Sequence, residues 1–180
     1  SGAYGSWMGF LTAVNGLLYF TVDDGMHGVE LWKSDGKEAG TAIVKDINSL
    51  TKNSSPVSLS EYNGLLYFTA DDGTHGRELW KSDGTTGGTQ LVKDIDTGSG
   101  DSDPESLVHV SGTVFFAADD GINGDELWKS DGTSGGTVMV KDINPGSNDS
   151  NPDWLVQANG LLFFTAVDGQ SGRELWMSDG

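Results

Sequence analysis

Paired aspartates in short turns are the residues of this chain whose type and spacing best fit a chemical role. Three turns read Asp-Asp-Gly and a fourth reads Val-Asp-Gly, which loses one carboxylate. The seven aspartates are Asp23, Asp24, Asp71, Asp72, Asp119, Asp120 and Asp168. Ca²⁺ binds about six to eight oxygen ligands, and carboxylates supply them. Asp-Gly is also common in hairpin turns, and the spacing is not that of an EF-hand, so the turns predict either a structural role or a calcium site.

Residues for acid–base or nucleophilic catalysis do not form a recognisable set. The chain has three histidines, of which His27 and His75 share one turn position and His109 stands apart. No nucleophile, carboxylate and histidine occur together in one part of the sequence only, as a catalytic site requires. The absence of cysteine excludes disulfides and thiolate metal sites. We therefore expect no enzyme, no catalytic residues and no cofactor other than Ca²⁺.

The net charge of the chain limits the classes of partner that it is expected to bind. The formal net charge is −17, from 27 acidic and 10 basic residues. Such a surface repels nucleic-acid phosphates and anionic lipid. The sequence also lacks an apolar run of the length that crosses a bilayer. We expect neither nucleic-acid binding nor membrane insertion.

An internal repeat is the strongest signal in the sequence. A Glu-Leu-Trp triplet occurs four times with a period of 48 residues, ending at Trp32, Trp80, Trp128 and Trp176. Ser-Asp-Gly triplets follow on the same period, and Asn-Gly or Ser-Gly pairs precede. Repeats of about 40–50 residues indicate that one small structural unit is stacked on copies of itself.

Each unit is expected to be a meander of four short strands. In the second unit they cover residues 59–62, 65–70, 78–82 and 89–95, separated by turns rich in Asn, Asp and Gly. The predicted fold is an all-β β-propeller with four four-stranded blades, and the alternative is a linear β-solenoid. Packing between blades is expected from the four tryptophans and from Leu and Phe at fixed positions, such as Leu11 and Phe20. Glu and Lys of neighbouring strands, such as Glu78 and Lys93, are expected to pair at the surface.

The ends of the chain predict an open sheet. We expect one domain, 1–180, with repeat units 15–62, 63–110, 111–158 and 159–180 plus 1–14, so that the last blade lacks its outermost strand. The third strand of that blade is then an edge that invites another strand. Either the N-terminal arm fills it, or a neighbouring copy donates a strand, or the sequence is an excerpt of a longer array. The expected assembly residues are Tyr4, Trp7, Trp176, Ser178, Asp179 and Gly180.

Two stretches carry a resemblance to known repeats. Residues 78–89 and 126–137 resemble the bacterial repeat pattern ELWxxDGTxxGT, and the likeness extends in weaker form over the whole chain, with Lys37 departing from it. Part of this stretch, Ser82–Thr89, also resembles the Asp-box turn of sialidase propellers, although the closing aromatic is absent. The first resemblance implies a secreted or cell-surface microbial protein and implies little about its activity.

Taken together, these patterns predict a non-enzymatic propeller on the cell surface or outside the cell. Its expected role is structural, in self-assembly or adhesion, with copies of itself as partners and strand donation at the open blade edge as the mechanism. The alternative is a carbohydrate-binding module that stacks surface glycans on Trp7 or Trp154. A propeller hydrolase is the least favoured hypothesis, because no catalytic constellation is visible.

Overall fold

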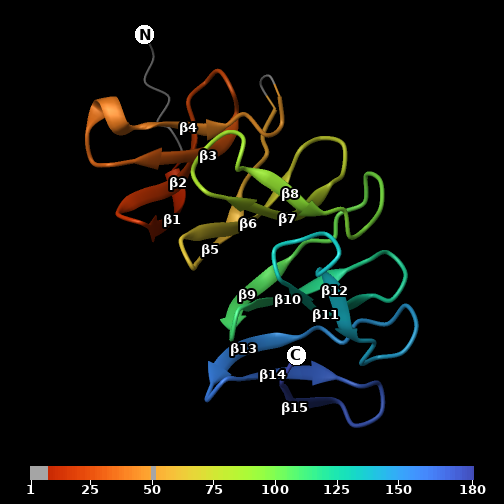
Figure 1. Cartoon of the computed structure of the whole chain (residues 1–180). Coiled ribbons are helices and arrows are strands. Elements are labelled where there is room, and N and C mark those ends of the chain that lie inside the picture. Colours follow the sequence, from red (N-terminus) through yellow and green to blue (C-terminus); the bar gives the residue numbers. More distant parts are fainter. Residues whose placement is uncertain (1–7, 50–51) are drawn as a thin grey trace. The chain divides into compact units, whose positions relative to one another are not determined.

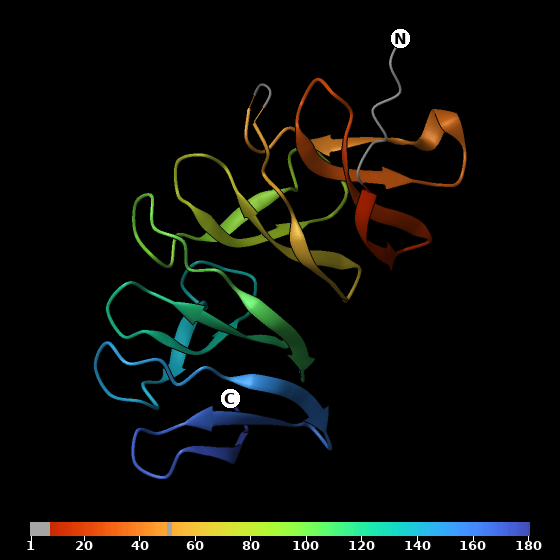
Figure 2. The ribbon, with the colours of Figure 1, turned by 180° about the vertical axis from the view of Figure 1, so that it is seen from behind.

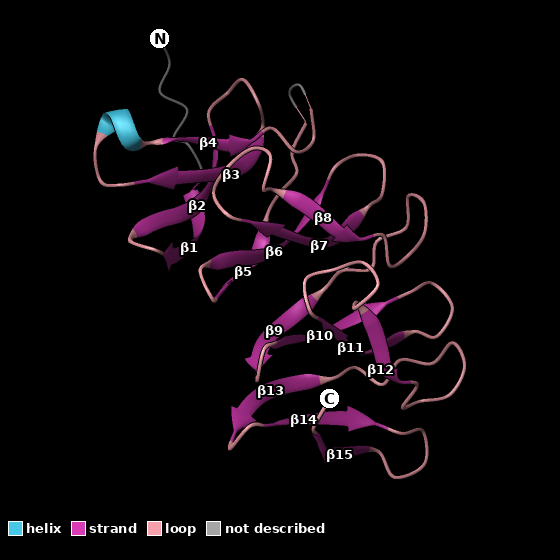
Figure 3. Cartoon of the chain, in the orientation of Figure 1, coloured by secondary structure: helices cyan, strands magenta, loops and turns pink. Residues whose placement is uncertain are grey.

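The computed structural model describes residues 8–49 and 52–180, and this part of the chain is all-β (Figure 1). One short 3₁₀ helix, η1 (Glu38–Gly40), is the only helix among the described residues (Figure 3). In the described part of the chain there is accordingly no helix long and apolar enough to span a membrane.

The strands form four antiparallel sheets, each built from a continuous stretch of chain. The first sheet has the order β1 (Met8–Val14), β2 (Leu17–Asp23), β3 (Val29–Ser34), β4 (Ala42–Lys45). The second has the order β5 (Val57–Tyr62), β6 (Leu65–Asp71), β7 (Arg77–Ser82), β8 (Gln90–Lys93). The third has the order β9 (Glu105–Val110), β10 (Thr113–Asp119), β11 (Asp125–Ser130), β12 (Val138–Lys141). The last contains only β13 (Asp153–Ala158), β14 (Leu161–Val167) and β15 (Arg173–Ser178).

This arrangement confirms the expected meanders and the missing strand of the last sheet. Contacts divide the chain into two compact units, Ser1–Thr74 with Trp80–Gln90, and His75–Leu79 with Leu91–Gly180. Within the first unit β1 contacts β5, and within the second β9 contacts β13, as both ribbon views show (Figures 1 and 2). Neighbouring sheets in a unit therefore meet through their first strands.

The residue types in the two-residue turns determine the geometry of the hairpins. Asn15 and Gly16 have φ of 49° and 79°, and Asn63 and Gly64 have 52° and 79°. A two-residue turn with positive φ at both positions matches the twist of the strands it joins, which is why Asn-Gly is favoured there. The predicted hairpins at these pairs are confirmed.

A bulge in the first strand of each sheet is a feature that the sequence did not predict. The register of the first two strands shifts in the first, second, third and last sheets alike. Inside the shifted stretch, one residue that is not glycine has a φ of 48° to 57°; these residues are Phe10, Ser58, Ser106 and Trp154. Bulges of this kind bend a strand and redirect its side chains.

The buried side chains come mainly from the second and third strands. Phe20, Phe68, Phe116 and Phe164 are 0% to 7% exposed, as expected for packing positions. In the second unit the core contains Val110, Phe115, Leu127, Ile143, Leu162, Phe164 and Ala166. Leu11, which we expected in the core, is 61% exposed, so that this expectation is wrong.

Candidate functional site

A buried glutamate in the first sheet binds the segment of chain that leads to the second sheet. Glu30 in β3 is fully buried. Its Oε2 accepts hydrogen bonds from the Ile47 amide at 3.0 Å and the Ser54 hydroxyl at 2.5 Å. Its Oε1 accepts from the amides of Asn48 at 3.3 Å and Ser54 at 3.1 Å. One carboxylate therefore holds both the exit of β4 and the approach to β5, and we call this arrangement the glutamate latch.

The glutamate latch recurs in the next two repeats. Glu78 binds the Ile95 amide at 3.0 Å and the Ser102 hydroxyl at 2.5 Å. Glu126 binds Ile143 and Ser150 in the same way, at 2.9 and 2.7 Å. Burial raises the pKa of all three carboxyl groups, that of Glu78 to about 7, while the hydrogen bonds oppose the rise.

The predicted pairing of glutamate and lysine at the surface is wrong. The glutamates bind backbone amides, whereas each lysine lies over the tryptophan of the following repeat. Lys45 Nζ is 5.5 Å from the ring centre of Trp80, and Lys93 Nζ is 5.6 Å from that of Trp128. The lysine stems thereby shield the indoles, and the charges remain at a cation–π distance.

The last sheet lacks this cover. Leu175 in β15 is 72% exposed, whereas its counterparts Leu31, Leu79 and Leu127 are 0% to 1% exposed. Glu174, the counterpart of the latch glutamates, is also exposed. The cause is the missing fourth strand, because that strand and the segment after it supply the covering side chains and the amides in the other sheets.

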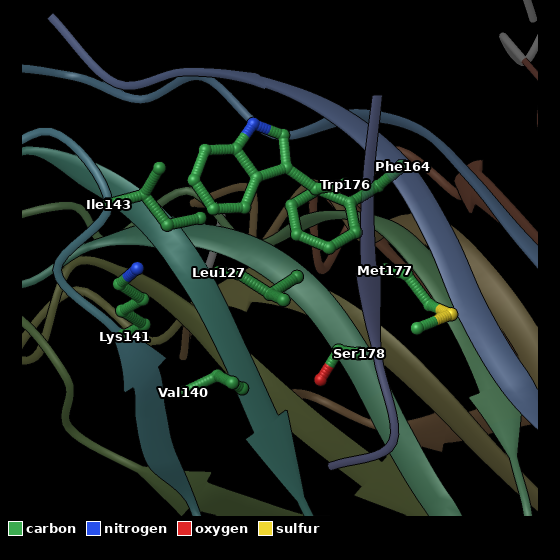
Figure 4. Close-up of a pocket in the computed structure, with 8 residues that line it drawn as sticks. All are labelled: Leu127, Val140, Lys141, Ile143, Phe164, Trp176, Met177 and Ser178. Atoms are coloured by element: carbon green, nitrogen blue, oxygen red, sulfur yellow. The ribbon is translucent and has the colours of Figure 1, made fainter. Parts of the chain in front are cut away.

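A cavity of about 290 Å³ opens beside this uncovered strand (Figure 4). Its lining residues come from the third and last sheets and are Leu127, Val140, Lys141, Ile143, Phe164, Trp176, Met177 and Ser178. Lys141 Nζ lies 5.1 Å from the ring centre of Trp176, so that the lysine–tryptophan stack is in place here as well. The cavity combines an aromatic wall with one ammonium and one hydroxyl group.

In the complete sheets a threonine of the fourth-strand segment occupies the corresponding position. Thr89 Oγ1 lies 2.7 Å from Ser82 Oγ, and the Thr89 carbonyl accepts from Lys45 Nζ at 2.8 Å. Thr137 makes the same contacts, with Ser130 at 2.7 Å and with Lys93 at 2.7 Å. Ser178 and Lys141 are the corresponding serine and lysine at the cavity.

Two of the expected assembly residues meet at the cavity. Trp176 and Ser178 line it together. Asp179 and Gly180 are exposed beyond it, where the Gly180 amide donates to Ser178 Oγ at 3.1 Å and its carbonyl accepts from Lys129 Nζ. Tyr4 and Trp7 lie outside the described residues. Lys141 and Leu175 were not among the predicted site residues, although both lie on the 48-residue period and could have been found from it.

Most of the exposed large apolar residues lie on the first and last sheets. In the first sheet they are Phe10, Leu11 and Leu18, and in the last Trp154, Val156, Leu175 and Met177. Two of these positions break the repeat: the bulge residue is aromatic in the terminal sheets but serine in the others, and Met177 stands where the other repeats have lysine. The sequence therefore differs from its own repeat at positions where the side chains are exposed.

The aspartates of the acidic turns act within their own turns. Asp24 Oδ1 accepts from the amides of Met26 and His27, at 2.9 Å each, and Asp168 Oδ1 accepts from Gln170 and Ser171 at 2.9 and 2.7 Å. The hydrogen bonds lower the pKa of Asp168. Among the described residues, no group of three or more acidic or histidine side chains is placed to hold a metal ion. These aspartates therefore have a structural role within their turns. A calcium site at the turns stays a prediction.

Comparisons with known proteins identify structures of similar fold. No family model matches the chain, and no curated protein matches its sequence. A puromycin hydrolase mutant complexed with PGG aligns with 96% of this chain and 27% of its own, at a TM-score of 0.65 and 14% identity. A structure from a study of two prolyl endopeptidases aligns with 96% of this chain and 26% of its own, at a TM-score of 0.50 and 12% identity. The chain thus spans about a quarter of the length of these structures.

These comparisons correct the prediction that the protein is not an enzyme. That prediction took an unbroken repeat as a sign of a non-enzymatic protein, and the structural neighbours are enzymes that contain a part with this fold. A propeller-like fold of this kind therefore also occurs as a part of enzymes. At 12% and 14% identity the likeness concerns the fold alone. What it shows is an all-β, propeller-like arrangement of antiparallel sheets.

Proposed function

We propose that this chain is a β-propeller module, with its four sheets as blades, that assembles with further copies of itself through its last sheet. The observation that carries the proposal is the 72% exposure of Leu175 at a position that is buried in every complete sheet. An apolar side chain at such a position stabilises the protein only when another surface covers it.

The edge of the last sheet supports strand donation as the mode of assembly. Among the described residues, β15 pairs with β14 alone, and the repeat places a fourth strand on its other side. An edge strand with free amides and carbonyls pairs readily with a strand from another chain. Each copy of this chain contains three strands of the required kind, β4, β8 and β12, and each of them is paired in its own sheet. A second copy is the proposed donor, and donation requires one of these strands to leave its own sheet.

The exposed side chains indicate how much such a contact contributes. Leu175 and Met177 are 72% and 60% exposed, and full burial of side chains of this size contributes about 1.5–3 kcal/mol each. The methionine replaces the lysine of the other repeats, which makes this face less polar than its counterparts. These two residues alone would supply several kcal/mol of the association energy.

Association should depend on Leu175 and not on apolar exposure in general. Leu175→Lys should weaken self-association by about tenfold or more, since burying an unpaired lysine costs at least about 1.4 kcal/mol. Ile122→Lys is the matched control, because Ile122 is equally exposed, at 72%, but lies in a turn. Light scattering after size-exclusion chromatography over a range of concentrations measures the effect. A wild-type chain that is monomeric throughout, or equal effects of both variants, would contradict the proposal.

The location we propose is outside the cell or on its surface. The resemblance of residues 78–89 and 126–137 to the bacterial ELWxxDGTxxGT repeat supports it, because that resemblance implies an extracytoplasmic protein. The net charge of −17 is compatible with solubility in that setting. Adhesion through assembled copies is the role that fits this location.

A carbohydrate-binding role is the second candidate, and Trp154 favours it. This residue is 77% exposed and is held at the bulge of β13 with a φ of 54°. An exposed indole offers an apolar face with a polar N–H, which suits contact with partly polar ligands. We expect binding to a glycan array to be lost in Trp154→Ala if this role holds. An array without hits for the wild-type protein removes the candidate.

A further inference from the structure

We infer that the cavity beside Trp176 is a socket for a threonine, and that it selects a partner strand of the type Gly-Gly-Thr-x-apolar-Val-Lys. The inference rests on the proposed function and names the chemistry of the partner. The proposed occupant is an extended segment with the sequence type that the three complete sheets hold at the corresponding place. The three complete sheets show what such a segment looks like when it is in place.

The first argument is the serine–threonine contact, which is the same in every complete sheet. Serine Oγ of Ser-Asp-Gly lies 2.6 to 2.7 Å from the Oγ1 of a threonine seven residues later, in the pairs Ser34 with Thr41, Ser82 with Thr89, and Ser130 with Thr137. The second and third of these contacts are buried. In the last sheet Ser178 lines the cavity at the serine position. Ser178 is partly buried, and its Oγ accepts from the Gly180 amide as Ser82 Oγ accepts from Gly84. A serine hydroxyl can make further hydrogen bonds, and in the complete sheets the further partner is a threonine.

The second argument is the lysine that reaches from the preceding sheet. Lys45 and Lys93 each donate from Nζ to the carbonyl of that threonine, at 2.8 and 2.7 Å. Each also stacks on the tryptophan of the repeat that holds the threonine. Lys141 already stacks on Trp176 and lines the cavity. We expect its ammonium group to donate a hydrogen bond to the carbonyl of a threonine bound there. A charged donor gives a stronger hydrogen bond than a neutral one.

The third argument is the register of the fourth strand, which fixes the residues after the threonine. Trp32 is opposite Ile43 and Trp128 is opposite Met139, two residues after Thr41 and Thr137 respectively. Leu31 and Leu127 are opposite the lysines Lys45 and Lys141. By the same register, a partner strand should place an apolar residue opposite Trp176 and a lysine opposite Leu175. A lysine stem there would cover the exposed leucine and leave its charge in solvent.

The test measures binding of a fluorescein-labelled peptide with the sequence of residues 85–96 to the full chain by fluorescence anisotropy. A peptide in which Thr89 is replaced by valine has the same shape without the hydroxyl and is the matched competitor. We expect the threonine peptide to bind and the valine peptide to bind about fivefold or more weakly, the factor of one lost hydrogen bond. A scrambled peptide of the same composition should not bind.

Two protein variants locate the socket. Lys141→Met should weaken binding of the threonine peptide by about tenfold, the factor of a charged hydrogen bond. Lys93→Met is the matched control, because this lysine serves a sheet that holds its own threonine, and peptide binding should not change. If no peptide binds, strand acceptance and the proposed function fail together. The threonine socket is wrong, while strand acceptance stands, if the threonine and valine peptides bind equally well. The same conclusion follows if Lys141→Met and Lys93→Met bind the threonine peptide equally well.

Discussion

Replacing Glu126 by alanine is expected to lower the free energy of unfolding by about 3–5 kcal/mol. Glu126 is fully buried and accepts hydrogen bonds from the amides of Ile143 and Asn144 and from the hydroxyl of Ser150. The substitution leaves three donors without their acceptor, two of them buried and one partly buried, and each buried group of this kind costs about 1–3 kcal/mol. Urea unfolding followed by tryptophan fluorescence measures the change.

Glu174→Ala is the matched control for this prediction. Glu174 occupies the same position in the last repeat but is exposed, so its replacement should change stability by less than about 0.5 kcal/mol. Equal losses in the two variants would show that the glutamate acts through the strand itself and not through the latch. A loss below about 1 kcal/mol for Glu126→Ala would show that water replaces the carboxylate at little cost.

The second large effect is a pH-dependent stabilisation by Asp125→Asn. Burial raises the pKa of Asp125 from 3.8 to about 7, with further contributions from Glu105, Asp149 and Glu126. An acid whose pKa is higher in the folded state stabilises the fold below its unfolded pKa, and this contribution is lost as the pH rises through the folded value. The destabilisation in the wild type therefore grows between about pH 4 and pH 7 and is constant above.

Asparagine at position 125 removes this ionisation. The variant should match the wild type near pH 4 and exceed it by about 1–2 kcal/mol at pH 8, less than the full electrostatic cost because the carboxyl group is partly exposed. Asp168→Asn is the control, because hydrogen bonds lower the pKa of Asp168 and its replacement should not stabilise the protein at pH 8. Urea midpoints at pH 4, 6 and 8 give the comparison. An advantage of Asp125→Asn that is independent of pH would contradict the assigned cause.

The repeat allowed much of the fold to be predicted. Period, strand number and the open last sheet follow from the spacing of the tryptophans and the Asn-Gly pairs, because both are tied to local structure: a turn that needs positive φ and strands of alternating polarity. Trp176 and Ser178 could be placed at the open edge for the same reason. Lys141 was within reach of the same reasoning, since its period is that of the tryptophans.

The glutamate latch could not be predicted from local pattern. Glu30 stands in an alternating strand, where a charged residue is normally exposed, and its partners Ile47 and Ser54 are 17 and 24 residues away. The carboxylate is surrounded by amides only because the segments around Ile47 and Ser54 come together in the folded chain. Leu11 was misplaced for a related reason: its position in the repeat is that of a packing residue, but burial depends on contacts with other parts of the fold, which the repeat alone does not give.

The glutamate latch also determines where this array can be cut and rejoined. Ser54, Ser102 and Ser150 belong by sequence to the approach of one sheet and by contact to the sheet before it. A shortened chain that ends just after a fourth strand therefore loses the hydroxyl and amide that hold its last glutamate. Deleting or duplicating 48 residues with both junctions placed just after these serines preserves every carboxylate with its partners. Shortened or lengthened versions of the protein should be joined at these points.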